Sequence, residues 1–307
     1  MSFWFYTTSV VLDRIGGCAR TGGALSERLA LATISVVIPT LDDIDPGLLA
    51  ELQAQTRPAE EIEVVRGVRP NGRARNLGIG RTHGEFLVLI DDDARPGHPE
   101  LIANLVSVLE ADGSIGAAGA SRLIPPDSSR FQRWAAREVA RIENPVVHTL
   151  LETNPESENN FYCEITTTCC ALRRDVFNRL GGFNEHLLQG VDTDFFVRLR
   201  RAGYRLVLVP DTWVHHPAPS TWRALLGKHF RYGVGHAQEV ALDPTRTRGL
   251  ERRPLAYLLF RTLLLLPNVF IPFSYATPSW RPGFKPLKAL VSYASALGFV
   301  WGSFRNF

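Results

Sequence analysis

The sequence predicts an α/β protein with a mixed, mostly parallel sheet flanked by helices and an apolar helical extension at its C-terminal end. From residue 34 onward, short apolar runs alternate with amphipathic runs, which is typical of strands and helices that follow one another along such a sheet. One apolar run, residues 86–90, leads directly into three aspartates, as a buried strand with a functional end would. With 307 residues, 45% of them hydrophobic, the chain can bury a large core.

The first half of the chain supplies most of the expected sheet. Strands are predicted at 34–38, 62–65, 86–90 and 115–120, and helices at 46–55, 73–81 and 99–111. Asp45 is the expected N-cap of the first helix, and Pro39 stops the first strand. Glycines inside 73–81 predict a broken helix there.

The second half is less regular. It predicts helices at 131–142, 175–180 and 192–202, strands at 165–172, 204–209 and 212–216, and a polar loop over residues 145–162. The resulting organisation is an N-terminal extension, 1–32, a main domain, 33–240, and an apolar C-terminal region, 241–307, that associates with a membrane or with a second copy.

Charge and cysteine content restrict the partners and the compartment. The net charge is +3, and the basic residues lack interleaved aromatics, which argues against nucleic-acid binding. The cysteines at 18, 163, 169 and 170 have no zinc-type spacing, so we expect reduced thiols in a cytoplasmic protein. No basic residue precedes the apolar N-terminal stretch, so a signal peptide is not expected.

Three adjacent carboxylates, Asp91, Asp92 and Asp93, are the most informative feature. Like charges at the end of a hydrophobic strand raise one another's cost of ionisation unless a cation compensates them. In extended backbone Asp91 and Asp93 point to one side and Asp92 to the other, so two hard oxygen ligands share a face. This favours Mn²⁺ or Mg²⁺; the alternative is an acidic turn that caps the helix expected from residue 99.

The last third of the chain has two apolar stretches, 255–273 and 287–301, with positive charge on their flanks. The first is interrupted by prolines and the second is too short for a simple spanning helix. An element that lies on, or re-enters, an anionic membrane surface explains the apolar face and the basic flank together. The alternatives are a dimer interface and a helix packed on the domain, so an oligomer stays open.

Several sequence motifs occur in the order and with the spacing of a known protein family. The chain resembles the family 2 glycosyltransferases of GT-A fold over roughly residues 33–220. The motifs are Ser35-Val36-Val37-Ile38-Pro39-Thr40, Arg73-Ala74-Arg75-Asn76-Leu77-Gly78, Leu89-Ile90-Asp91-Asp92-Asp93, Gly181-Gly182-Phe183-Asn184-Glu185 and Gly190-Val191-Asp192-Thr193-Asp194. The resemblance implies a Rossmann-like nucleotide-diphospho-sugar transferase fold and inverting, metal-dependent transfer from a nucleotide-sugar donor. The expected acceptor is a lipid-linked saccharide or a surface polysaccharide, on the inner face of the cell membrane.

The resemblance also implies roles at the aspartates. Asp93 is the first expected metal ligand, and Asp91 and Asp92 approach the ribose and the sugar of the donor. His216, after Pro210, lies where the family often places a metal-binding histidine, with the adjacent His215 as its competitor.

The remaining donor contacts come from the first strands and the helix after them. By resemblance we expect Pro39, Thr40 and Asn76 at the donor. Arg66 and Arg73 would meet the diphosphate through planar guanidinium groups, although a solvated loop is the alternative for Arg66. The sequence departs from the family because no carboxylate ends the second strand. Asp42 or its neighbour Asp43, just after Pro39-Thr40, is expected to supply a contact to the base or the ribose instead.

The expected general base is Asp192, which would take the proton from the acceptor hydroxyl. Its alternative role is the cap of the helix that follows. Val191 stands where the family often has glutamate, which is a second departure. Two other functions stay open: a nucleotidyltransferase, and a degenerate GT-A domain that acts as a scaffold on a membrane.

Overall fold

A computed structural model describes residues 32–154, 165–244, 249–274, 279–280 and 282–305. The chain divides into two units, Met1–Ala32 and Thr33–Phe307. The expected N-terminal extension, 1–32, therefore lies almost wholly outside the described residues, as do Cys18 and Cys163.

The strands agree closely with the sequence in the first half and less closely in the second. They are β1 Ile34–Thr40, β2 Glu61–Arg66, β3 Phe86–Ile90, β4 Arg95–Pro96, β5 Ile115–Leu123, β6 Leu151–Thr153, β7 Cys169–Arg173, β8 Arg205–His215, β9 Phe273–Ser274 and β10 Ser279–Trp280. The short strands β4 and β6 were not expected, because two or three residues carry no readable alternation.

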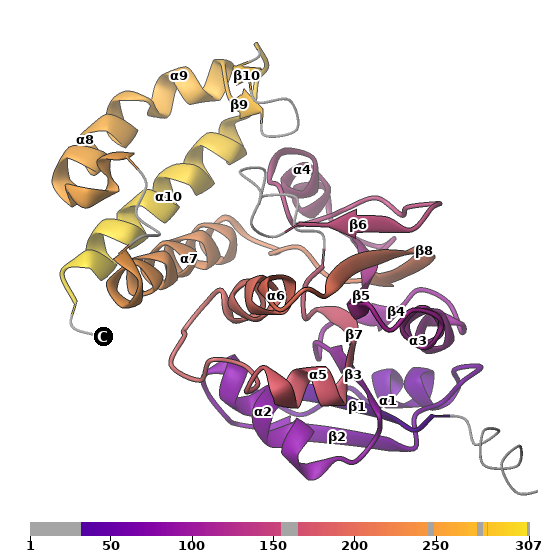
Figure 1. Ribbon diagram of the computed structural model, residues 1–307. Coiled ribbons are helices and arrows are strands. Elements are labelled where there is room, and N and C mark those ends of the chain that lie inside the picture. Colours follow the sequence, from indigo (N-terminus) through magenta and orange to yellow (C-terminus); the bar gives the residue numbers. More distant parts are fainter. Residues whose placement is uncertain (1–31, 155–164, 245–248, 275–278, 281, 306–307) are drawn as a thin grey trace, which may run out of the picture. The chain divides into compact units, whose positions relative to one another are not determined.

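The helices cover the sheet and build the C-terminal region (Figure 1). They are α1 Pro46–Gln53, α2 Asn71–Arg81, α3 Leu101–Ala111, α4 Arg130–Glu138, α5 Arg174–Arg179, α6 Val191–Arg201, α7 Trp222–Leu242, η3 Gly249–Arg252, α8 Pro254–Leu263, α9 Leu265–Phe270 and α10 Pro286–Ser303. The expected cap of α1 is confirmed, because the Asp45 side chain accepts a hydrogen bond from the Gly47 amide.

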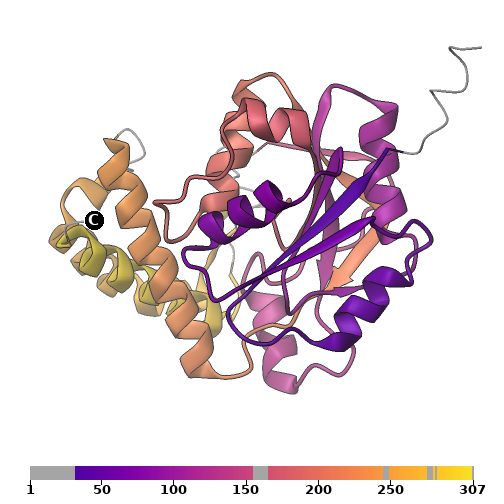
Figure 2. The same ribbon diagram turned by 90° about the horizontal axis from the view of Figure 1, so that it is seen from below.

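The main sheet has eight strands, in the order β2-β1-β3-β7-β5-β8-β4, with β6 also paired to β8 (Figure 2). β1 is parallel to β2 and β3, and β5 is parallel to β8. β7 enters antiparallel between β3 and β5 and joins the two parallel parts. The predicted mixed sheet flanked by helices is confirmed.

Helix α2 corrects one expectation, since it starts at Asn71 and runs unbroken. Gly78 does not interrupt it; a Cβ there would lie 2.5 Å from Val37 Cγ1 and 2.9 Å from Val65 Cγ2. The glycine therefore lets the helix lie closely against β1 and β2. Close packing, rather than a break, explains its place in the helix.

The two strands expected at 204–209 and 212–216 form one strand, β8. A register shift against β5 between Gly119 and Ser121 absorbs the irregularity around Pro210, and Asp211 has a positive φ of 48°. Such a bulge re-aims the residues that follow it. The end of β8 and His216 consequently lie beside the strand β4.

The core beneath the sheet is aromatic and includes buried thiols. Phe177, Phe183 and Phe195 are packed with ring centroids 4.8–5.5 Å apart. Cys169 and Cys170 of β7 are buried and free, as expected of packing residues. Burial raises the pKa of both thiols, so neither offers a reactive thiolate.

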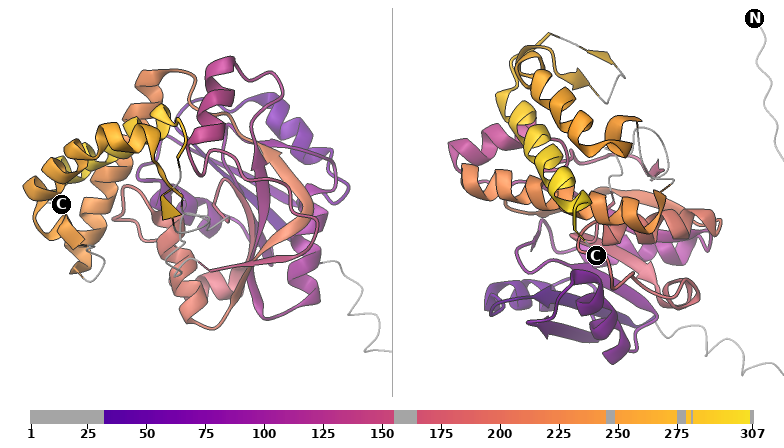
Figure 3. Two further views of the ribbon diagram at one scale, coloured as in Figure 1. Left: turned by 90° about the horizontal axis from the view of Figure 1, so that it is seen from above. Right: turned by 90° about the vertical axis from the view of Figure 1, so that its left-hand side faces the viewer.

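In the C-terminal region α10 packs along α7 with glycines at the contact (Figure 3). A Cβ on Gly233 would lie 1.9 Å from the Ser295 carbonyl oxygen, and one on Gly298 would lie 1.9 Å from that of Phe230. The Glu138 carboxylate of α4 accepts the Leu287 amide at 2.8 Å and so satisfies the start of α10. For α10 the structure thus favours the third of the sequence's alternatives, a helix packed on the domain.

Among the described residues, no helix has both the length and the apolar character needed to cross a membrane.

Candidate active site

The parallel strands bring several expected site residues together at the carboxyl ends of the strands. Thr40 at the end of β1 pairs with Arg66 at the end of β2, and the Gly67 amide donates to the Thr40 carbonyl at 2.9 Å. Asp91 follows the end of β3, on the other side of β1. The carboxyl ends of parallel strands are a recurrent ligand site in α/β proteins.

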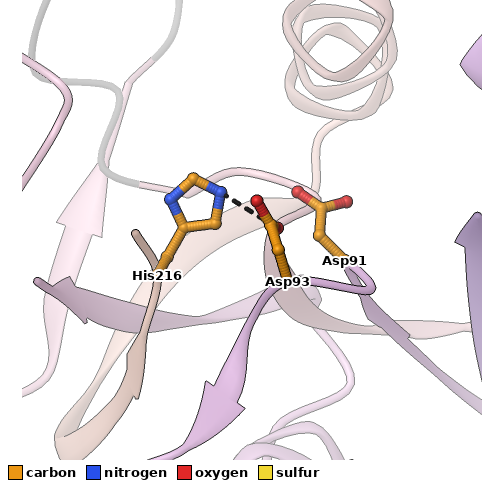
Figure 4. A group of neighbouring side chains, drawn as sticks. All are labelled: Asp91, Asp93 and His216. Atoms are coloured by element: carbon orange, nitrogen blue, oxygen red, sulfur yellow. Dashed lines mark ion pairs between the residues drawn. The ribbon is translucent and has the colours of Figure 1, made fainter. Parts of the chain in front are cut away.

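Asp91, Asp93 and His216 form the central cluster (Figure 4). Each offers one ligand atom, and these atoms lie within 4.8 Å of one another. His216 Nε2 lies 3.3 Å from Asp93 Oδ1. Asp92 is not part of the cluster. Asp92 and Asp93 lie in a turn after β3 and not in the extended backbone that the sequence predicted, because the Ala94 amide donates to the Asp91 carbonyl at 3.1 Å.

Strand β4 explains how residues so distant in sequence meet. Arg95, two residues after Asp93, pairs with His215 at the end of β8. This pairing places His216 beside the aspartates. The competitor His215 has its Nδ1 3.3 Å from the Ile124 carbonyl oxygen and lies outside the cluster.

The alternative role of the aspartates, as a cap of the helix expected from residue 99, is not what the structure shows. Helix α3 begins at Leu101 after Glu100, whose side chain makes no cap hydrogen bond, and Gln55 Oε1 accepts the Ile102 amide of the first turn at 3.2 Å. β4 lies between the aspartates and α3.

Arg75 compensates the most enclosed of the three aspartates. Burial raises the pKa of Asp91, while the charge of Arg75 and then that of His216 oppose the rise. Arg75 Nη2 lies 2.6 Å from Asp91 Oδ1, and the Arg75 side chain is only 3% exposed. Its Nε has no protein partner among the described residues. In the sequence Arg75 was visible only as part of a motif, whereas in the structure it neutralises a carboxylate of the cluster.

Asp93 is more open and is surrounded by positive charge. Burial alone would raise the pKa of Asp93, but the contact with His216 and the charges of His216 and Lys228 outweigh burial and lower it. Lys228 lies on α7, and nothing in the sequence connected it with the aspartates. Its proximity depends on how α7 folds back after His216, which no local pattern records.

The three ligand atoms of the cluster fit a divalent cation. Two carboxylates supply hard oxygens, and an imidazole adds a nitrogen that Mn²⁺ accepts more readily than Mg²⁺. Asp91 thereby joins Asp93 and His216 as a candidate ligand, in addition to its expected role at the donor.

We expect Arg75→Gln to weaken Mn²⁺ binding by on the order of tenfold, and more at acidic pH. Without Arg75, the pKa of Asp91 rises further, so this carboxylate is protonated, and lost as a ligand, until a higher pH is reached. Isothermal titration calorimetry with Mn²⁺ over a pH series measures this, with the exposed Arg73→Gln on the same helix as matched control. Equal affinity in both variants at every pH would refute the role of Arg75.

Asp192, the expected base, lies half-buried in the first turn of α6. It does not cap the helix, which corrects the alternative role: the N-cap is Gly190, whose φ of 74° suits glycine. Asp192 Oδ1 accepts the Thr193 amide at 2.9 Å. Asp194, in contrast, is paired with Arg198 at 3.0 Å.

Cys170 connects the base candidate with the cluster. This buried residue feels the charges of Arg75, Asp192 and Asp91, so all three lie around the same part of β7. The start of β7 is adjacent as well, since the Asp91 amide donates to the carbonyl of Thr168, directly before this strand, at 3.0 Å. The base candidate and the cation candidate thus border one region.

The expected donor residues differ in their surroundings. Pro39 and Thr40 are buried at the end of β1, and the Thr40 hydroxyl bridges to the backbone of Asp42. Asp42, Arg66 and Arg73 are exposed. Their contacts with a nucleotide-sugar donor stay predictions.

Asn76 has a different task from the one expected. Its Nδ2 donates to the Phe183 carbonyl and to Glu185 Oε1, both at 2.9 Å, and its Oδ1 accepts the Phe183 amide at 2.9 Å. The side-chain amide is directed at protein atoms and holds the 181–185 turn. We therefore assign it a positioning role instead of direct donor contact.

Comparison with known proteins places the chain in a family. A sequence model of glycosyl transferase family group 2 matches residues 86–303, more than two thirds of the chain. The chain therefore belongs to this family, as the motifs indicated.

Curated relatives agree with this assignment. Glycosyltransferase AglE of Haloferax volcanii is 29% identical over 64% of this chain and 58% of its own length. Succinoglycan biosynthesis protein ExoM of Rhizobium meliloti is 28% identical over 74% of each chain. This chain covers a much smaller share of the length of other relatives, down to 12%.

The fold is similar to that of a solved GT-A enzyme. Mannosyltransferase PcManGT from Pyrobaculum calidifontis, in complex with GDP-Man and Mn²⁺, superposes with a TM-score of 0.56 over 89% of this chain and 88% of that one. The two are 17% identical in sequence, so the likeness concerns the fold.

Proposed function

We propose that the protein transfers a sugar from a nucleotide-sugar donor to a saccharide or lipid-linked acceptor in polysaccharide synthesis, with inversion and with dependence on Mn²⁺ or Mg²⁺. The observation that carries this proposal is the cluster of Asp91, Asp93 and His216 at the ends of the central strands. The printed names of relatives such as ExoM, and the GDP-Man and Mn²⁺ bound to PcManGT, support the donor, cation and product class.

Charge on the leaving diphosphate sets the chemical requirement. A divalent cation held by Asp91, Asp93 and His216 would stabilise that charge. Lys228 adds a positive charge on the side of Asp93. Arg66 at the end of β2 and Arg73 in the first turn of α2 are exposed and would contact the diphosphate. The backbone around Thr40 and Asp42 would face the nucleoside.

The proposed inversion rests on the role given to Asp192, whose carboxylate would act as a general base and not as the nucleophile of a double displacement. A double displacement needs a side chain that attacks the anomeric carbon. Cys169 and Cys170 are buried thiols with raised pKa values and cannot do so. Asp192 instead takes the proton of the acceptor hydroxyl while that oxygen attacks, which is a single displacement with inversion. We further propose a cytoplasmic enzyme on the inner face of the cell membrane, where a lipid-linked acceptor would be presented.

A thermal-shift screen tests the proposal on the full-length protein. Nucleoside diphosphates and nucleotide sugars are compared with and without Mn²⁺, because a ligand that binds only the folded state raises the melting temperature. We expect a nucleoside diphosphate to raise the melting temperature only when Mn²⁺ is present. The nucleotide sugar that stabilises the protein should then release its sugar during incubation with the enzyme. No stabilisation by any nucleotide would support a scaffold, and nucleoside triphosphates as the preferred ligands would support a nucleotidyltransferase; either result overturns the proposal.

A further inference from the structure

Helices α8 and α9 carry apolar side chains on the face that points away from the rest of the unit. No side chain of these two helices, which lie wholly within the described residues, is buried. Six large apolar residues that we call the outer face are each more than half exposed. They are Leu255, Leu259, Leu263, Leu266, Phe270 and Phe284. A patch of this kind on a folded protein marks a binding surface.

The opposite side of the same helices is already used for packing, so the outer face is not an unfinished core. Tyr257 and Leu258 pack against Phe299 of α10 and its neighbours. Arg261 Nη2 donates to the Ser292 carbonyl of α10 at 3.2 Å. Phe270 and Phe284 lie with ring centroids 5.8 Å apart, which joins Phe284 to the end of the helical stripe. Figure 1 shows α8 and α9 on the far side of α10 from α7.

The segment that carries the outer face has charges of one sign. After Glu251 the sequence contains no Asp or Glu and seven basic residues, more than the net charge of +3 of the whole chain. The basic residues of this stretch are Arg252, Arg253, Arg261, Arg281, Lys285, Lys288 and Arg305. Arg252 and Arg253 are exposed directly before α8.

We propose that the outer face binds flat on an anionic lipid bilayer. A bilayer surface supplies an apolar layer for the leucines and phenylalanines and anionic headgroups for Arg252 and Arg253, which are exposed directly before α8. A second copy of the chain fits less well, because a two-fold contact would bring the same acid-free segment against itself. The inference stands on this surface alone and does not depend on the proposed reaction.

The outer face has a fixed connection to the candidate active site. α8 and α9 pack on α10, and α10 packs along α7 through glycine contacts. α7 starts six residues after His216 and carries Lys228, whose charge reaches Asp93. A bilayer bound at the outer face would therefore lie at a fixed distance from the cluster, which suits an acceptor that stays in the membrane.

Vesicle co-sedimentation of the full-length protein tests the proposal. We expect binding to phosphatidylcholine vesicles that contain phosphatidylglycerol, weaker binding to phosphatidylcholine alone, and partial release by salt. Leu259→Glu with Leu263→Glu should weaken binding by at least about tenfold, because two exposed leucines that enter the apolar layer become charged. The matched control is Leu151→Glu, an exposed leucine on β6.

Melting temperatures and nucleotide binding of the variants show that the fold and the donor site are intact, so failure here and failure of the proposed reaction are distinguishable. Charge reversal at Arg252 and Arg253 should remove the preference for anionic vesicles. The proposal is overturned if the protein does not bind vesicles, or if Leu151→Glu weakens binding as strongly as the outer-face variant. It is also overturned if sedimentation equilibrium shows that the wild-type protein is a dimer and the outer-face variant is a monomer.

Discussion

Asp93→Ala should abolish sugar transfer, with a loss of about three orders of magnitude or more in kcat. Asp93 is the cluster residue whose carboxylate contacts His216 and feels the charge of Lys228. Removing it leaves two of the three ligand atoms, Asp91 and His216, and takes away the carboxylate whose lowered pKa keeps it ionised. The measurement is transfer or donor hydrolysis as a function of Mn²⁺ concentration.

A structural defect is separable from this loss. The Asp93 side chain is 53% exposed, so its truncation should leave the melting temperature unchanged. Asp175→Ala is the control, because Asp175 is an exposed aspartate in a surface pair with Arg179. Calorimetry should show weakened Mn²⁺ binding for Asp93→Ala alone; wild-type activity and affinity in this variant would remove the cation assignment.

Asp192→Asn should keep donor affinity and lose turnover, by a factor between about 10² and 10⁴ in kcat. The asparagine keeps the shape and can still accept the Thr193 amide bond, but it cannot take a proton from the acceptor. Steady-state kinetics separates kcat from the donor KM, and nucleotide binding by calorimetry checks the donor site directly.

Asp194 offers a control on the same helical turn. It pairs with Arg198, which also donates to the carbonyls of Leu180 and Gly182. Asp194→Asn should therefore lower the melting temperature while kcat stays within about threefold of the wild type. If Asp192→Asn lost only donor affinity, or if both variants lost turnover equally, Asp192 would not be the base.

The Asp91 and Asp93 part of the candidate site could be anticipated from local sequence. The apolar strand ends directly before these carboxylates, and the structure brings Asp91 and Asp93 together. The chain turns at Asp92 and Asp93, where the Ala94 amide donates to the Asp91 carbonyl at 3.1 Å, so the expected alternation of an extended chain is not the cause. His216 required the resemblance as well, because two histidines were available and only the pairing of β4 with β8 separates them. Arg75 and Asn76 were visible as motif residues, but their hydrogen-bond partners were not. Arg75 bonds to Asp91, 16 residues away, and Asn76 bonds to the 181–185 turn, 107 residues away at Phe183.

By itself the sequence determined the α/β class, the strand that presents the aspartates, the cap at Asp45 and the acid-free apolar end of the chain. These features depend on periodicity and on neighbours within a few residues, which the order of amino acids records directly. Only the tertiary structure decided that β7 runs antiparallel between β3 and β5, that Arg75 neutralises Asp91, and which face of α8 and α9 stays uncovered. Those outcomes depend on contacts between distant segments, whose energies no local pattern contains.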